Sequence, residues 1–112
     1  MRKDCDVKFD CHCGAAIVDQ TDDLPHKAHL IPDQAWFATY DAIDAEVIEP
    51  AADGRLSKEA AHQHARRILN RSAKLVWQCR ACGRLYVDDT EGRLRSFVPE
   101  GNSADRGVLR GK

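Results

Sequence analysis

Hydrophobic residues in the middle of the chain recur with a helical period. They are spaced three or four residues apart, the spacing that lines one face of a helix. With Pro32 well placed as a first helical residue, this pattern predicts an amphipathic helix that ends near Glu49–Pro50. The predicted apolar face consists of Trp36, Tyr40, Ile43 and Val47, with Phe37 and Ile48 beside them.

A second helix is predicted from Ser57 to about Ser72. Ser57 is a good N-cap, and Glu59 places a negative charge in the first turn, where the helix dipole favours it. The stretch PAADGR separates this helix from the first, so residues 31–74 are expected to form a helical hairpin. The apolar positions of the second helix are Ala61, Ala65, Ile68 and Leu69.

Short runs with strand character lie on both sides of this hairpin. AAIVD from Ala15 and RLYVD from Arg84 contain the β-branched or aromatic residues that strands favour. DTEG then predicts a turn, and the alternating stretch RLRSFVPE predicts a returning strand that Pro99 ends. The predicted fold class is α+β, a small antiparallel sheet with an inserted two-helix hairpin.

Two of these strands follow copies of one short pattern. CHCGAAIVDQTD begins at Cys11, and CRACGRLYVDDTEG begins at Cys79. When the copies are aligned on their last cysteines, Cys13 and Cys82, no gap is needed. The identical pairs after the cysteines are Gly14 and Gly83, Val18 and Val87, Asp19 and Asp88, and Thr21 and Thr90.

The cysteines predict a metal site. The N-terminus has no apolar run and no stretch is long enough for a membrane helix, so we expect a cytoplasmic protein, in which disulfides are uncommon. Close cysteine pairs there are typical of halves of a four-thiolate site. We predict that the ligands are Cys11, Cys13, Cys79 and Cys82, and that the metal is Zn²⁺, with iron as the alternative.

The fifth cysteine, Cys5, lies in a charged segment outside the repeat. It is either a free thiol, which we expect, or a substitute for Cys11 or Cys13 as a ligand. His26 and His29 form an H-x-x-H pair, but no further ligands accompany them. We expect the segment DLPHKAHLIPDQ, which holds both histidines, to be a solvated or hydrogen-bonded loop.

The two Cys-Gly pairs, Cys11, Cys13 and Gly14 with Cys79, Cys82 and Gly83, resemble the zinc-ribbon, or rubredoxin-like, family. The resemblance covers residues 7–22 and 75–99. It implies one zinc-ribbon domain over residues 1–100, with knuckles at 9–22 and 77–99, and residues 101–112 are expected to be a flexible tail. The first knuckle has one residue between its cysteines where the family usually has two, which argues against rubredoxin-like electron transfer.

Composition sets limits on function. A chain of 112 residues is one domain's worth, and its net charge of −1 gives no general attraction to nucleic acid or membrane. No catalytic motif such as H-E-x-x-H or a phosphate-binding glycine loop is present, and a site with four cysteine ligands has no open position for an activated water. We therefore expect a protein that is not an enzyme.

The charges of the hairpin are segregated. The stretch from Ile31 to Gly54 contains six acids and no lysine or arginine, whereas Arg55 to Lys74 contains six bases and one acid. Either the helices complement each other, or they present charged faces to a partner. The acids are Asp33, Asp41, Asp44, Glu46, Glu49 and Asp53, and the bases are Arg55, Lys58, Arg66, Arg67, Arg71 and Lys74.

These features favour a protein–protein interaction module, such as an immunity protein or an inhibitor-type regulator. We expect a protein partner with a basic surface, facing the acidic helix, and no membrane partner. The alternative is a nucleic-acid-binding zinc ribbon of transcription or translation, which the basic helix and further arginines would support. Those further arginines are Arg80, Arg84, Arg93 and Arg95.

Overall fold

The computed structural model describes residues 7–20, 23–89, 91–101 and 106–111. Strands and helices divide between two compact units, and the combination confirms the predicted α+β class. One unit contains the chain up to His29 together with the chain from Leu75 onward, and the other spans Leu30–Lys74. In the described part of the chain, no helix combines the length and the apolar character needed to cross a bilayer.

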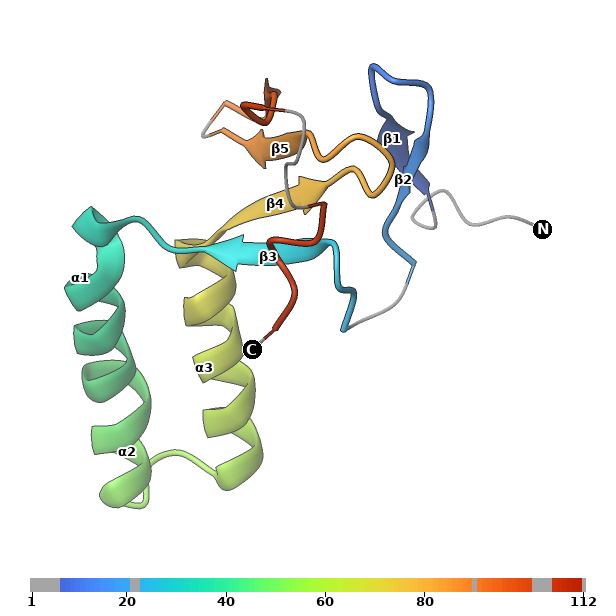
Figure 1. Cartoon of the computed structure of the whole chain (residues 1–112). Coiled ribbons are helices and arrows are strands. Elements are labelled where there is room, and N and C mark those ends of the chain that lie inside the picture. The colour runs from blue at the N-terminus through green and yellow to red at the C-terminus, as the bar shows by residue number, and fades with distance from the viewer. Residues whose placement is uncertain (1–6, 21–22, 90, 102–105, 112) are drawn as a thin grey trace. The chain divides into compact units, whose positions relative to one another are not determined.

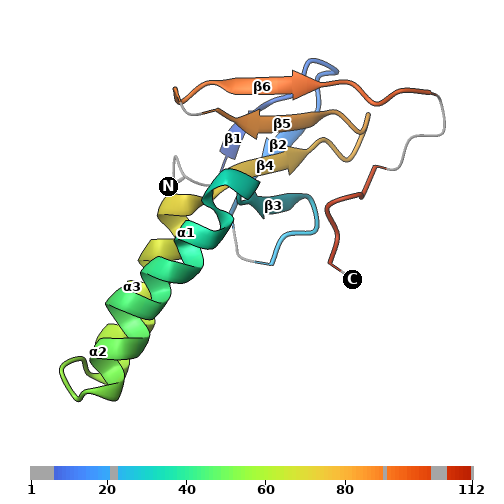
Figure 2. The ribbon, with the colours of Figure 1, turned by 90° about the vertical axis from the view of Figure 1, so that its left-hand side faces the viewer.

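The first unit is built on two sheets. In the smaller sheet β1 pairs antiparallel with β2, and Phe9 lies opposite Ile17. The larger sheet has the strand order β3-β4-β5-β6, with neighbouring strands antiparallel (Figures 1 and 2). The strands are β1 (Val7–Asp10), β2 (Ala16–Val18), β3 (Lys27–Leu30), β4 (Lys74–Gln78), β5 (Leu85–Asp88) and β6 (Leu94–Phe97).

The repeat-derived strands and the returning strand are confirmed as β2, β5 and β6. The loop predicted for DLPHKAHLIPDQ is wrong in part, because Lys27–Leu30 forms strand β3. Lys27–Leu30 itself contains none of the β-branched residues that identify a strand locally. The strand instead depends on a segment far away in the sequence, shown by the Gln78 N–H that donates to the His26 carbonyl at 2.8 Å.

Asp19 links the smaller sheet to the larger one inside this unit. Its carboxylate accepts a hydrogen bond from the Trp77 indole N–H at 3.1 Å and lies 2.8 Å from the Lys27 ammonium. Phe9 packs edge-on against Trp77 and Tyr86, with ring centroids 5.7 and 4.9 Å apart. The aromatic core therefore joins β1, β4 and β5.

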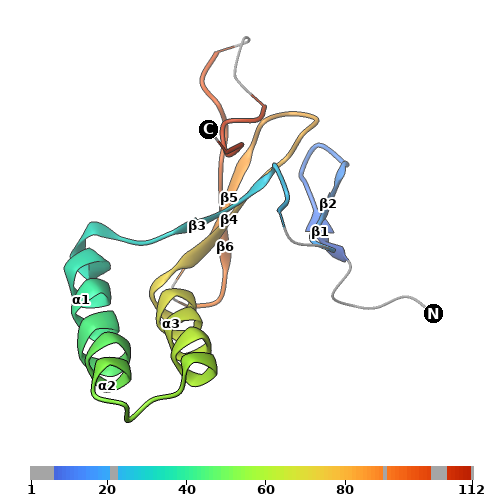
Figure 3. The same ribbon diagram turned by 90° about the horizontal axis from the view of Figure 1, so that it is seen from below.

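The second unit is the predicted helical hairpin. Figures 1 and 3 both show the segment formed by α1 and α2 side by side with α3. The Ser57 hydroxyl caps α3 by accepting a hydrogen bond from the Ala60 N–H at 3.1 Å, as predicted. The elements are α1 (Asp33–Ile43), a π-helical turn η2 (Asp44–Ile48), α2 (Glu49–Ala52) and α3 (Lys58–Ser72).

The first helical segment ends at Ala52, two residues beyond the predicted end near Glu49–Pro50, so Pro50 lies inside it. Proline normally ends a helix because it lacks an N–H and its ring presses on the carbonyl four residues earlier. Here the π-helical turn Asp44–Ile48 directly precedes Pro50. In a π turn each backbone hydrogen bond spans one residue more than in an α-helix. The carbonyls before Pro50 are therefore spaced differently from those of a regular α-helix.

The predicted apolar face of the first helix is wrong for its aromatic residues. Trp36, Phe37 and Tyr40 are 42%, 71% and 51% exposed, whereas Thr39 is buried. The buried Thr39 hydroxyl donates a hydrogen bond to the Ala35 carbonyl at 2.7 Å. The predicted positions Ile43 and Val47 do belong to the core of the hairpin, and so do Ala61, Ala65 and Ile68 of α3, with Ala42 and Leu56 packed against them, whereas the predicted Leu69 is exposed.

The physical reason is the size of the side chains at the helix contact. The spacing between packed helices depends on the residues that meet there, and alanine and threonine allow a close approach. Helical periodicity placed Trp36 and Tyr40 on one stripe with Ile43 and Val47, but in the first half of the segment the chain buries the smaller Thr39 in place of the aromatic rings. The large aromatic rings are consequently left on the outer face of α1.

We predict that Ile68→Ala will destabilise the protein by about 2–5 kcal/mol, because it removes a fully buried side chain from the hairpin core. Phe37→Ala should change the unfolding free energy by only about 0.5 kcal/mol, because that ring is mostly in water. Denaturant unfolding followed by circular dichroism would measure both. A larger loss for Phe37→Ala than for Ile68→Ala would mean that the aromatic stripe is the packed face after all.

Candidate metal centre

Four cysteine sulfurs converge in the first unit. The Sγ atoms of Cys11 and Cys82 lie 3.6 Å apart, and those of Cys13 and Cys79 also lie 3.6 Å apart. All four sulfurs are within 4.8 Å of one another, and this is the only such group of potential ligands in the described ranges. The structure therefore brings together all four predicted ligands, close enough to hold a metal ion.

The two cysteine loops fold with the same hydrogen bonds, despite their different lengths. The N–H of the first cysteine donates to the carbonyl of the residue after the glycine, from Cys11 to Ala15 at 2.8 Å and from Cys79 to Arg84 at 2.9 Å. In each loop the glycine N–H also donates back to the carbonyl of the first cysteine, at 2.9 and 2.8 Å. The repeat in the sequence is thus a repeat of the turn that presents the thiols.

The glycine of each loop is required by its backbone conformation. Gly14 has φ of +99° and Gly83 has φ of +87°, values that residues with a side chain rarely adopt. No atom lies within 4 Å of a Cβ built on Gly14, so the dihedral angle alone selects glycine there. The conformation turns the chain back so that the strand after each glycine leaves the loop.

The spacing of the sulfurs fits a tetrahedral metal. Metal–sulfur distances of about 2.3 Å in a tetrahedron place the sulfurs about 3.8 Å apart. The observed 3.6 Å pairs and the 4.8 Å limit for the whole set agree with a tetrahedron of this size. Cys11 and Cys79 are buried while Cys13 is exposed, so the group lies at the edge of the core.

Thiols held this close cannot all ionise without a cation between them. Burial, together with the neighbouring thiols of Cys13 and Cys11, raises the pKa of Cys79 to about 11, although backbone N–H groups of the second loop act in the opposite direction. Burial also raises the pKa of Cys11, but hydrogen bonds from the Cys13 N–H and the Tyr86 hydroxyl outweigh it and lower the value to about 6. A bound dication would stabilise every member of the set as a thiolate.

Tyr86 supports the first knuckle from β5. Its hydroxyl donates to the Cys11 sulfur at 3.2 Å and accepts a hydrogen bond from the His12 backbone N–H at 3.1 Å. Tyr86 is 4% exposed, and its ring packs against Phe9. The contact fixes the orientation of one potential ligand, the Cys11 thiol, and ties the two copies of the repeat together.

Arg84 adds a positive charge beside the sulfurs. One guanidinium nitrogen donates to the Cys82 sulfur at 3.7 Å. The neighbouring thiols of Cys11 and Cys82 raise the pKa of the guanidinium above its ordinary value. A centre made of four thiolates and a dication is negative overall, so a fixed guanidinium offsets part of its charge. Arg84 therefore contacts the centre itself rather than standing only as a surface base.

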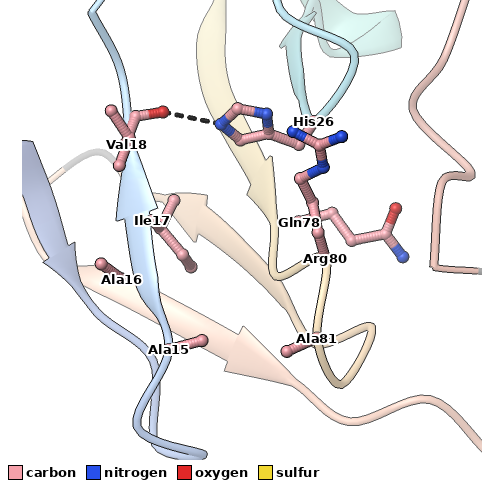
Figure 4. Close-up of a pocket in the computed structure, with 8 residues that line it drawn as sticks. All are labelled: Ala15, Ala16, Ile17, Val18, His26, Gln78, Arg80 and Ala81. Carbon is pink, nitrogen blue, oxygen red and sulfur yellow. Dashed lines mark hydrogen bonds between the residues drawn. The ribbon is translucent and has the colours of Figure 1, made fainter.

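A cavity of about 230 Å³ lies beside the knuckles, between β2 and the second cysteine loop (Figure 4). His26 closes one side of it, with its Nε2 donating to the Val18 carbonyl at 2.6 Å, while Nδ1 has no partner among the described residues. His26 is buried and His29 is exposed, and neither joins the sulfur group. In the described chain His26 therefore binds a strand backbone rather than a metal.

Gln78 connects the second knuckle to the C-terminal segment. Its side-chain amide donates to the Gly83 carbonyl at 3.1 Å, and its side-chain oxygen accepts a hydrogen bond from the Val108 N–H at 2.9 Å. Gln78 is 2% exposed. The segment predicted as a flexible tail thus has at least one specific contact, while Cys5 lies outside the described residues.

The sequence indicated the four sulfurs but missed the residues that support them. Tyr86 aligns with Ile17 in the repeat, and both are buried in the same core, so apolar patterning explains the position without its hydroxyl. Arg84 looked like a surface base. The signal available for both was their place soon after the second cysteine pair, Arg84 just before β5 and Tyr86 within it.

Fold and site together define an α+β protein with a candidate four-cysteine metal centre and an inserted helical hairpin. Residues 7–101 match the family described as Domain of unknown function (DUF8617), so the chain belongs to that family. No match was found among curated proteins or among solved structures.

We predict that Tyr86→Phe will weaken metal binding by roughly 10–100-fold, because it removes the hydroxyl that orients Cys11 while keeping the ring in the core. Competition against a chromophoric chelator would measure the affinity. Tyr40→Phe is the matched control, because that hydroxyl belongs to an exposed ring on α1. Equal affinities for both variants would show that the Tyr86 hydroxyl does not support the centre.

Proposed function

We propose that this protein is a non-enzymatic, zinc-stabilised module that binds another protein, with a zinc ribbon as its metal-binding part. The observation that carries the proposal is the convergence of four sulfurs from two loops far apart in the sequence. A structural metal gives a small unit rigidity that its modest core cannot supply alone. The immunity-protein or inhibitor-type role is one form that such a module takes.

Zinc is the metal that we assign to the centre. It takes four sulfur ligands in a tetrahedron and has no redox chemistry, which suits a site whose role is structural. Iron is the alternative for four sulfurs, but the short first loop departs from the two regular knuckles of rubredoxin-like sites. Cytosolic location, in which these thiols stay reduced, belongs to the same proposal.

Binding rather than catalysis follows from the ligand set. With four protein ligands, a tetrahedral ion has no position left for a substrate or an activated water. The nearby cavity is lined mainly by alanines and other apolar residues, and its histidine already donates to a backbone carbonyl. Among the described residues no carboxylate lines this cavity, which supports a binding role over a catalytic one.

Charge on the hairpin supports an interaction with a protein. The two helices complement each other at Glu46, which lies 2.8 Å from His64 and 3.3 Å from Arg71. Within the described residues, the other acids of the first helical segment make no ion pair. These unpaired acids are Asp33, Asp41, Asp44 and Glu49. Asp53 lies just after the segment and pairs with Arg55.

The nucleic-acid alternative has less support. Arg93 lies 2.6 Å from Glu91, and Arg95 lies 3.0 Å from Asp89, so nearby carboxylates offset both charges. Arg84 is directed at a cysteine sulfur. Of the four arginines named for this role outside the hairpin, Arg80 alone is exposed without an ion pair in the described chain.

We predict one zinc per chain and the loss of that zinc in Cys82→Ser. Structural zinc provides apparent binding free energies of about 10–16 kcal/mol, more than the stability of most small domains, so a chelator should also unfold the first unit. Elemental analysis and circular dichroism would test both results. Cys5→Ser is the matched control and should keep its full metal content. Metal retention by Cys82→Ser, or metal loss in Cys5→Ser, would overturn the ligand assignment.

The binding role is tested by affinity capture from the native host lysate, with and without nuclease treatment. We expect the zinc-loaded protein to retain a discrete protein partner that nuclease does not release and that chelation does release. Retention of nucleic acid alone, or of a partner that depends on it, would replace the proposal with the nucleic-acid alternative. Turnover of a small molecule by the pure protein would overturn the non-enzymatic assignment.

A further inference from the structure

The outer face of α1 combines exposed aromatic rings with unpaired acids. Residues four apart lie above one another on a helix, so this face consists of two neighbouring rows. One row contains Asp33, Phe37 and Asp41, and the other contains Trp36, Tyr40 and Asp44. We call these six residues the aromatic–acidic face and propose that it binds an arginine-rich segment of a protein partner.

The rings of this face form a contiguous surface. Tyr40 lies between the other two, with its centroid 5.2 Å from Trp36 in an edge-on contact and 6.3 Å from Phe37. All three side chains are at least two-fifths exposed. Tryptophan and tyrosine are enriched among the residues that dominate binding at protein interfaces, so a cluster of exposed rings on a rigid helix fits a docking surface.

Carboxylates lie beside the rings in both rows. Asp33 and Asp41 are one helical turn before and after Phe37, and Asp44 follows Tyr40 at the same spacing. All three acids are exposed, and they make no ion pair in the part of the chain that the structure describes. No lysine or arginine occurs between Ile31 and Gly54, so the helical segment carries no local charge of opposite sign.

This combination selects arginine among the possible partner groups. A guanidinium stacks on an aromatic face and at the same time donates two parallel hydrogen bonds to a carboxylate. Lysine offers a point charge that satisfies the carboxylate but stacks less well. An apolar partner alone would leave the acids facing a surface that cannot pair with them, and an acidic partner or nucleic acid would be repelled.

The inference rests on the proposed role in protein binding and names the chemistry of the partner. A defined probe tests it without the natural partner, namely a short peptide in which arginines alternate with leucines. Isothermal titration at physiological salt should show saturable binding to the zinc-loaded full chain. The same peptide with lysine in place of arginine should bind several-fold more weakly, because lysine loses the stacking contact.

The substitutions Phe37→Ala and Asp41→Asn, tested separately, should each weaken peptide binding by about tenfold or more. Matched controls are Phe97→Ala and Glu59→Gln, which alter an exposed ring on β6 and an exposed acid on α3, and they should leave the affinity unchanged. Circular dichroism of each variant would show that the fold is intact. Both tested residues are exposed, so substitution should not unfold the hairpin.

Three outcomes would overturn the inference. Equal losses in the test and control variants would mean that the peptide responds to general charge, and equal affinity for the arginine and lysine peptides would remove the stacking argument. Concentration-dependent dimers that Phe37→Ala abolishes would mean that a second copy of the chain covers this face. Capture of a partner that needs zinc but tolerates Phe37→Ala would reject this surface and leave the proposed function intact.

Discussion

The structure depends on the close approach of four thiols from two loops separated by more than 60 residues in the chain. Their sulfurs share one small volume, where like charges would repel and uncharged thiols would make only weak hydrogen bonds. A bound cation would convert this unfavourable arrangement into a strongly favourable one. The surrounding contacts hold the sulfurs in that position, through the paired turn hydrogen bonds, the Tyr86 hydroxyl and the aromatic core.

The repeat explains how so short a chain builds such a site. Each copy encodes a tight turn whose backbone N–H groups point at the thiol of its first cysteine. A strand follows this turn in each copy. The turn hydrogen bonds survive the missing residue of the first loop because they join the ends of the loop and not its middle. The hairpin can then be inserted between the copies with its own core, as its separate buried cluster shows.

Sequence reasoning succeeded where the determinants are local. The cysteine and glycine spacing, the Ser57 cap and the strand after each knuckle each require only neighbouring residues. It failed where the outcome depends on distant ones, as with strand β3 and the choice between two stripes of α1, and it also missed the π-helical turn before Pro50. Periodicity identifies a stripe of large apolar residues but does not show which stripe another helix can approach most closely, and here the smaller residues around Thr39 and Ala42 occupy the contact.

The exposure of the aromatic stripe of α1 changes the role that these residues can have. Had Trp36, Phe37 and Tyr40 formed the core, they would account for the stability of the hairpin and need no further role. With 42–71% of their surface exposed, they gain only part of what full burial would give, because the hydrophobic contribution scales with the apolar area that folding removes from solvent. A substantial part of the free energy available from these rings, the larger part for Phe37, would therefore be realised only if another surface covered them, and the acids alongside favour a surface of positive charge.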